Sequence, residues 1–325
     1  MTTPASSASS AAPAASGGGG GTHPPAPQRT GAAVWGALAI VYVVWGSTYL
    51  AIRVTVETVP PFLSAGGRFV VAGLILAAIV AWRRGAGALR VTGRQLASAA
   101  LVGLLLLLGG NGLVVLAETS VPSGLAALLV AGVPVWIVLL RRLSGERPGA
   151  ATFGGVGLGV AGLAVLTVPG FSGDVGLGGV LTVVAGTLLW SLGSFASGRL
   201  PMPRDPLAAS ALEMVAGGLG CLLMGLGRGE QHDLVLGEIS GRSWFALGYL
   251  VVFGSLVAFT AYVWLLHSAP LSLTATYAYV NPVVAVLLGA LILDEALTWS
   301  VVLGGAVVVS GVCLIVTTER VRKRT

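Results

Sequence analysis

The chain has 325 residues, of which 55% are hydrophobic and only 9% are charged, and its mean hydropathy is +0.92. Soluble domains carry about 25% charged residues, so this composition excludes an ordinary soluble protein. The net charge of +6 lies in short basic clusters between apolar runs, a pattern that indicates membrane topology and excludes nucleic acid as the partner.

Residues 1–31 consist mainly of Ala, Ser, Gly and Pro. This composition cannot bury a core, so we expect a disordered N-terminal tail. The segment also lacks the short apolar region of a signal peptide.

Ten apolar runs of membrane-spanning length follow the tail. Short turns around Pro122 and Pro270 separate two pairs of runs that could each be misread as one long helix. We therefore expect an all-α membrane protein with ten transmembrane helices. The runs are 33–52, 62–82, 95–116, 121–140, 149–168, 176–197, 207–227, 243–266, 272–293 and 299–317.

The basic residues test this count, because Lys and Arg concentrate in cytoplasmic loops. With ten spans, fourteen of the 18 Lys and Arg residues fall on the side of the N-terminal tail. Arg53, Arg228 and Arg242 fall on the other side, and Arg68 lies inside the second run. The bias predicts a multi-pass protein of the cytoplasmic (plasma) membrane, with both termini cytoplasmic and a basic C-terminal tail at 319–325.

The two halves of the chain resemble each other at a nearly constant offset. Trp45 matches Trp190 and Arg68 matches Glu213, both 145 residues apart, and Val133-Pro134 matches Asn281-Pro282 at 148. This indicates a duplication into residues 32–169 and 170–318. Because each half has an odd number of spans, the second copy must insert upside down. Such inverted repeats surround a central cavity in many secondary transporters.

The ninth run carries polar residues at helical spacing. Thr274, Tyr277 and Asn281 lie at i, i+3 and i+7, so on a continuous helix they share one face. Pro282 leaves a backbone carbonyl near Ala278 without its helical partner, which a membrane helix tolerates. Polar groups on one face of an intramembrane helix are expected to face inward. We interpret this face as one wall of a polar cavity.

Two charged residues lie inside predicted spans, and each has two interpretations. Arg68 either holds an anionic group of a substrate, or snorkels to the outer interface or pairs with helix-end carbonyls. Glu213 either binds a substrate amine or a coupling proton, or is an interfacial acid that pairs with Arg204 or a helix end.

Amides and aromatic rings complete the candidate site. Asn111, within the sequence GGNG, can bond either a ligand or a neighbouring helix, and helix contact is the favoured role. Trp45 and Trp190 fall in the middle of their runs, whereas many membrane aromatics mark only the interface. The ten candidate substrate-binding residues are Trp45, Tyr49, Arg68, Asn111, Trp190, Glu213, Tyr262, Thr274, Tyr277 and Asn281.

Three segments resemble a known family. They are WGSTY at 45–49, the GGRFVVAGLIL segment that contains Arg68, and YVNPVVAVLLGALILDEALT at 279–298. The sequence resembles the EamA family of the drug/metabolite transporter superfamily over residues 33–317. The resemblance implies ten helices around a central cavity, cytoplasmic termini and, in many members, export of amino acids, metabolites or toxic compounds.

We therefore expect a secondary active transporter that exports small metabolites such as amino acids by alternating access, with proton coupling through Glu213 as a further hypothesis. The alternatives are a multidrug or nucleotide-sugar carrier of the same superfamily, a channel-like protein, or an intramembrane enzyme. The enzyme alternative is supported only by the GFSG motif at 170–173. The sequence contains no Walker A loop, HExxH or Cys/His cluster, so we expect no cofactor and no metal. The expected partners are a small-molecule substrate and the lipid bilayer, and a homodimer is left open.

Overall fold

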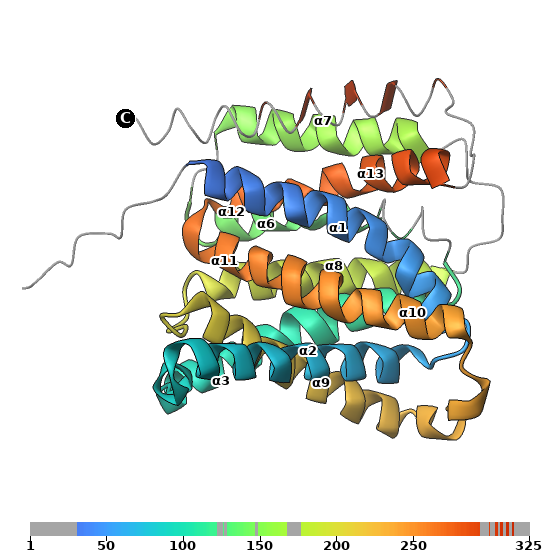
Figure 1. Ribbon diagram of the computed structural model, residues 1–325. Coiled ribbons are helices and arrows are strands. Elements are labelled where there is room, and N and C mark those ends of the chain that lie inside the picture. The colour runs from blue at the N-terminus through green and yellow to red at the C-terminus, as the bar shows by residue number, and fades with distance from the viewer. Residues whose placement is uncertain are drawn as a thin grey trace, which may run out of the picture.

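A computed structural model describes residues 31–121, 126, 129–146, 149–167 and 177–292, with separate positions between 299 and 314. Within these residues all regular structure is helical (Figure 1). The expected disordered tail up to residue 30, the GFSG segment, Asp294, Glu295 and the basic C-terminal tail lie outside the described residues.

The first half begins with two long helices, α1 (Ala32–Val56) and α2 (Pro61–Arg84). Its third helix is continuous through α3 (Gly93–Gly103), the π-helical segment η2 (Leu104–Gly112) and α4 (Leu113–Ala117), and α6 (Val133–Leu143) and α7 (Ala150–Thr167) follow. The second half has α8 (Leu177–Ser197), α9 (Pro206–Gly227), a third helix made of α10 (Gly241–Tyr249), the π-helical η6 (Leu250–Phe259) and α11 (Thr260–Ser268), and then α12 (Leu271–Thr274) and α13 (Tyr277–Ile292).

Several helices begin at caps that the local sequence encodes. The side chains of Thr92 and Gln95 form a capping box at the start of α3. The Asp205 carboxylate accepts from the backbone N–H of Leu207 at the start of α9, where Pro206 occupies the first helical position. These signals fix the connections between neighbouring helices.

Six of the described helices are long and apolar enough to cross a membrane. They are α1, α2, the helix at 93–117, α8, α9 and the helix at 241–268. Their ends agree with the expected runs to within a few residues. The described chain is therefore a multi-pass, all-helical membrane protein.

The ninth run does not form the single continuous helix that was expected. α12 ends at Thr274 and α13 begins at Tyr277, with a turn at Ala275 and Thr276 between them. At the break, the hydroxyl group of Thr276 donates a hydrogen bond of 2.6 Å to the Leu273 carbonyl. A side chain thus occupies a carbonyl group at the end of α12. The shared helical face of Thr274 with Tyr277 and Asn281 was therefore a wrong prediction. Pro282 lies inside α13, as predicted.

The fourth run is interrupted as well. Ala131 and Gly132 form a turn directly before α6, which begins at Val133 and continues past the predicted end through Arg141 and Arg142. The predicted uninterrupted helix at 121–140 is therefore wrong. Both halves thus carry a break before the helix that contains the X-Pro pair of the repeat.

In the described part of the chain, α2 and α9 run in opposite directions, and so do α1 and α8 (Figure 1). Arg84 at the end of α2 pairs with Asp205 at the start of α9. The first helices behave likewise: Arg53, in the last turn of α1, donates to the Glu118 carbonyl, and the first turn of α8 lies against the neighbouring Ser120 and Val121. The end of α1 and the start of α8 therefore lie at the same end of the bundle.

The contact between α2 and α9 is reciprocal. A Cβ atom added at Gly73 would lie 3.0 Å from the Ala211 carbonyl oxygen, and one added at Gly218 would lie 3.0 Å from the Gly66 carbonyl oxygen. Gly73 and Gly218 are 145 residues apart, and so are Gly66 and Ala211. The same backbone contact thus occurs twice across the seam, in the register of the sequence repeat.

Glycines also bring the fifth helix close to the end of the chain. A Cβ atom added at Gly311 would lie 2.8 Å from the carbonyl oxygen of Gly155 and 2.8 Å from the backbone nitrogen of Gly159. These glycines therefore pack against each other within one chain.

Candidate functional site

A cavity of about 70 Å³ lies among helices of both halves. One water molecule needs roughly 10–15 Å³ by the same measure, so the space holds several waters or a small ligand group. Residues from α1, α2, η2, α4, α6, α8, η6 and α13 line it. Seven of the ten candidate residues contribute to this lining: Trp45, Tyr49, Arg68, Asn111, Trp190, Tyr277 and Asn281.

Four aromatic rings pack together at one side of the cavity, and three of them form its wall. The ring centroid of Trp45 lies 5.4 Å from that of Trp190 and 5.0 Å from those of Tyr262 and Tyr277. The Trp45 and Tyr277 rings meet edge to face, an arrangement favoured by the quadrupoles of aromatic rings. Tyr262 does not line the cavity itself, but its ring packs against the other three rings.

Hydrogen bonds hold this wall in place. Trp190 Nε1 donates to the Tyr262 hydroxyl at 3.0 Å, that hydroxyl lies 2.6 Å from Ser194 Oγ, and Ser194 Oγ donates to the Trp190 carbonyl at 2.8 Å. With Tyr262 donating to Ser194, all these groups are satisfied in one closed ring of hydrogen bonds. Trp45 Nε1 donates to the Gly254 carbonyl of η6 at 3.1 Å. The rotamers of both tryptophans are thereby fixed.

Arg68 supplies the positive charge in the lining. Its side chain is buried, with 4% of its surface exposed, so it does not snorkel to the interface. Nε donates to Ser255 Oγ of η6 at 3.0 Å, and the guanidinium lies 4.3 Å from the centroid of the Phe69 ring. Among the residues that the structure describes, no carboxylate forms an ion pair with it. The lining therefore includes a buried guanidinium group held by Ser255 and Phe69.

The two asparagines in the lining have different surroundings. Asn281 faces the backbone carbonyls of Tyr277 and Tyr42, and with its amide nitrogen turned toward them it donates to both, at 3.1 and 3.2 Å. It therefore links α13 to α1. Asn111 Oδ1 is buried and has no hydrogen-bond partner in the described part of the chain. The expectation that Asn111 joins helices has no support here, and its oxygen is an unused acceptor at the cavity.

Glu213 and Thr274 lie outside the lining. Glu213, in the second turn of α9, is fully buried, and neither carboxylate oxygen has a hydrogen-bond partner among the described residues. It therefore pairs neither with Arg68 nor with Arg204. The Thr274 hydroxyl group donates to the Pro270 carbonyl at 3.2 Å, so its hydrogen bond stays within α12 and its N-cap.

Glu118 was not among the predicted residues, although it is as buried as Glu213. Neither of its carboxylate oxygens has a hydrogen-bond partner in the described residues. Asn111, Val114 and Glu118 lie at i, i+3 and i+7, and the first two line the cavity. This spacing is the signal that could have found Glu118, which lies just beyond the predicted apolar run at 95–116.

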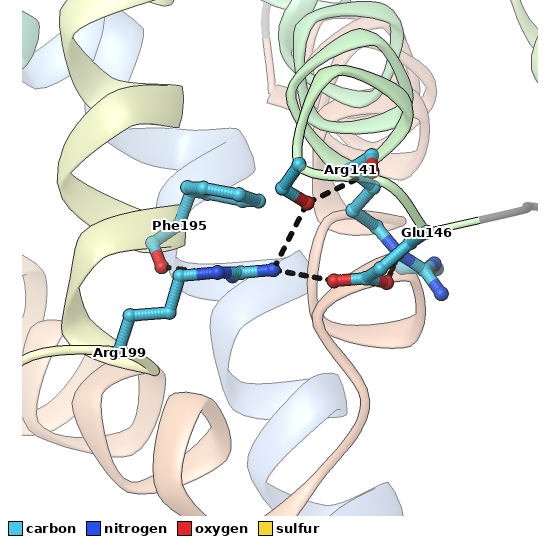
Figure 2. A network of polar contacts seen from close by, with 6 residues as sticks. Arg141, Glu146, Phe195 and Arg199 are labelled. Atoms are coloured by element: carbon cyan, nitrogen blue, oxygen red, sulfur yellow. Dashed lines mark hydrogen bonds and ion pairs between the residues drawn. The ribbon is translucent and has the colours of Figure 1, made fainter.

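A polar network joins three elements at the end of the bundle that carries most of the basic residues (Figure 2). Glu146 accepts from Arg141 Nε at 2.8 Å and also from Arg199, whose guanidinium lies 3.5 Å from the centroid of the Phe195 ring. Arg141 also donates to Ser272 of α12. Partial burial alone would raise the pKa of the Glu146 carboxyl group. The two guanidinium groups outweigh this effect and hold the pKa of Glu146 below its usual range. The network ties the α6–α7 connection to α8 and α12.

A buried cavity with a fixed cation, enclosed by apolar helices, defines a multi-pass membrane protein built to hold a small molecule. The chain belongs to the EamA-like transporter family, whose model matches residues 33–168 and 177–317. It is a membrane transporter of the EamA/drug-metabolite transporter superfamily and not an enzyme, as the sequence predicted.

Curated relatives agree with this assignment, and a solved structure shares the fold. The uncharacterized inner membrane transporter YedA of Escherichia coli K12 is 39% identical over 284 residues, covering 87% of this chain and 90% of YedA. The uncharacterized transporter YvbV of Bacillus subtilis is 26% identical and covers 88% of this chain and 92% of YvbV. A crystal structure with 23% sequence identity matches the fold with a TM-score of 0.71 over 88% of this chain and 97% of that chain.

Proposed function

We propose that the protein is a secondary active transporter that exports small metabolites, amino acids among them, by alternating access across the cytoplasmic membrane. The observation that carries this proposal is the cavity, whose lining combines the Arg68 guanidinium with a cluster of aromatic rings. A guanidinium recognises a carboxylate strongly, and aromatic rings accept apolar groups or cations. An amino acid offers all three kinds of group.

The proposed architecture is two inverted five-helix repeats, 32–169 and 170–318, with ten spans in total. The reciprocal contact across the α2–α9 seam and the opposite directions of α1 and α8 support it. The two successive matches of one family model give further support. Rocking of one repeat against the other would expose the cavity to each side in turn.

The first experiment measures transport of amino acids by the purified protein in proteoliposomes. Arg68→Gln removes the cation and is expected to reduce saturable flux by roughly 10- to 100-fold, the equivalent of a lost hydrogen bond to a charged group. Arg83→Gln is the matched control, because Arg83 is exposed at the far end of the same helix. Equal flux in both variants would contradict the proposed role of Arg68.

The same preparation identifies the class of cargo. The aromatic wall also suits flat or cationic compounds, so a multidrug or nucleotide-sugar carrier is the second candidate. A thermal-shift screen across amino acids, nucleosides, nucleotide sugars and cationic drugs separates the two. Stabilisation by cationic drugs alone, and not by amino acids, would favour the second candidate.

Proton coupling is proposed to depend on Glu213. A buried carboxyl group without hydrogen-bond partners is expensive to ionise, which suits a site that gains and loses a proton during transport. In proteoliposomes, transport by the unmodified protein should respond to an imposed pH gradient, and Glu213→Gln should abolish that response. A gradient response that survives the substitution would remove Glu213 from the coupling mechanism.

The proposed topology places both termini in the cytoplasm. In a chain without Cys221 and Cys313, single cysteines introduced into the two tails should react with an impermeant thiol reagent only after the membrane is permeabilised. Labelling of one terminus alone in intact cells would contradict the inverted repeat, because an odd span count would follow.

A further inference from the structure

The side chain of Asn111 lines the cavity, and its oxygen atom has no bonding role within the fold. Asn111 Oδ1 is buried and has no hydrogen-bond partner among the described residues. An unpaired buried acceptor costs free energy, and such groups are few in native proteins. A donor group on a molecule held in the cavity would give this oxygen the partner that the fold does not supply.

Other polar side chains of the lining are already satisfied within the protein. The hydroxyl groups of Thr48 and Thr187 each donate to the backbone carbonyl three residues earlier, at 2.8 Å. The amide nitrogen of Asn281 donates to two backbone carbonyls, and both indole nitrogens of the wall also donate within the protein. These groups therefore need no ligand, in contrast to Asn111.

The aromatic wall connects Asn111 to Arg68 through direct contacts. A Cβ atom added at Gly110, the residue before Asn111, would lie 2.7 Å from a ring carbon of Trp190. Trp190 packs against Trp45, which donates to the η6 carbonyl next to the serine that binds Arg68. The unpaired acceptor and the buried guanidinium thus border one cavity and are joined through two rings with fixed positions.

We propose that Asn111 selects substrates by accepting a hydrogen bond from a donor on the carbon next to the carboxylate that Arg68 binds. α-Amino acids and α-hydroxy acids share this chemistry, with an N–H or an O–H donor. Among the described residues that line the cavity, Arg68 is the one charged side chain. A single carboxylate therefore neutralises it, whereas a dianion would bring a negative charge without a partner into a buried site.

This inference rests on the proposed anion-binding role of Arg68 and adds a second contact to it. A site that hydrogen-bonds an N–H or O–H group of its substrate discriminates against the analogue that lacks the group, because the acceptor of the site then stays unpaired. The cavity should therefore distinguish a carboxylate with an adjacent donor from the same carboxylate without one.

The test uses alanine, lactate and propionate, which share a carboxylate and a three-carbon skeleton and differ only in an ammonium group, a hydroxyl group or a hydrogen atom. Affinity is measured by thermal shift at neutral pH, where all three carboxylates are ionised, with the full-length protein in lipid nanodiscs. Alanine and lactate should bind more tightly than propionate, by roughly 3- to 100-fold, the range for one hydrogen bond to a neutral or charged donor. The tighter of the two identifies amino acids or hydroxy acids as the preferred class.

Asn111→Leu removes the acceptor at similar side-chain size. In this variant the advantage of alanine and lactate over propionate should disappear, while the affinity for propionate is retained. The control Gln231→Leu changes an exposed amide in the α9–α10 connection and should keep the advantage. An equal loss of affinity for all three acids in Asn111→Leu would show that Asn111 only supports the fold, and would overturn the inference.

The unmodified protein tests the inference even if Asn111→Leu does not fold. Propionate that binds as tightly as both other acids overturns the role of Asn111 and leaves Arg68 as an anion site. Propionate affinity that is unchanged in Arg68→Gln overturns the anion-binding role of Arg68, and with it both proposals. The same conclusion follows if none of the three acids stabilises the unmodified protein.

Discussion

At the scale of single residues, the site contrasts satisfied and unsatisfied polar groups. The Tyr262 hydroxyl closes a ring of hydrogen bonds with Trp190 and Ser194 and so fixes the aromatic wall. The Tyr279 hydroxyl is equally buried but has no hydrogen-bond partner in the described residues. These two tyrosines allow a comparison of how a hydrogen-bonded hydroxyl and an unpaired hydroxyl each affect the free energy of unfolding.

We expect Tyr262→Phe to lower the unfolding free energy by about 1–2 kcal/mol, because Trp190 Nε1 loses its acceptor in a dry site. It should also reduce transport, since the wall loses its fixed geometry. Tyr279→Phe is the matched control and should be neutral or stabilising, because it removes an unsatisfied group. Thermal unfolding of the two variants checks both expectations, and equal destabilisation would contradict the first.

Much of the candidate site could be predicted from sequence because polar groups are conspicuous in apolar runs. Trp45, Trp190 and Arg68 stood out by their depth, and all three line the cavity. Whether Glu118 or Glu213 belongs to the site depends on the tertiary packing around each helix end. Spacing along one helix does not contain that information, which is why one acid was missed and the other lies outside the lining.

At the scale of elements, glycines control how closely helices approach. A Cβ atom at Gly218 would lie 2.7 Å from the backbone nitrogen of Val70, and backbone cannot move aside as a flexible side chain can. Gly67, one residue after a seam glycine on α2, has nothing within 4 Å of its hypothetical Cβ atom. One helix thus offers both a crowded and an open glycine.

Gly218→Ala and Gly73→Ala should each destabilise the protein by about 1–3 kcal/mol through overpacking of the seam. Gly67→Ala should instead be neutral or stabilise by up to about 1 kcal/mol, because Ala favours the helix. Urea or thermal unfolding in a defined detergent measures the differences. Similar losses in all three variants would show that crowding is not the cause.

The start of α2 has a cap that comes from a distant loop. A carboxylate oxygen of Glu230, in the α9–α10 connection, accepts from the backbone N–H of Leu63 at 3.0 Å. We expect Glu230→Ala to lower stability by about 1–2 kcal/mol, because it removes an acceptor and a negative charge at a helix N-terminus. Glu238→Ala, an exposed acid in the same connection, is the control and should have no effect on thermal unfolding.

At the scale of the whole molecule, composition and periodicity predicted the helical class and most helix ends, because a bilayer demands apolar runs of fixed length. The breaks at Ala131–Gly132 and Ala275–Thr276 were not predicted. A short irregular stretch costs little where protein surrounds it, and apolar composition alone does not distinguish such a stretch from helix. The Glu146 network, which joins three elements, likewise depends on their assembly.

Glu146 gives the molecule a testable pH dependence at its basic end. Its folded-state pKa is depressed, so its contribution to stability is present above its unfolded pKa of about 4.3 and is lost as pH falls through the folded value. Glu146→Gln should therefore be less stable than the unmodified protein at neutral pH, and the difference should shrink in acid. Thermal unfolding as a function of pH measures it, with Asp233→Asn as an exposed control. A difference that is constant with pH would contradict the ion-pair explanation.

The backbone contact between α2 and α9 limits how the halves can move. Helices that interlock through long side chains can shift along each other by changing rotamers, but atoms of the main chain have no such freedom. Axial sliding would drive the Cβ atoms of neighbouring residues into the opposing main chain at both reciprocal points together. Rotation about the line between these two points keeps them in contact. The seam therefore favours rotation over sliding, so under the proposed alternating access we expect the two halves to tilt about this contact.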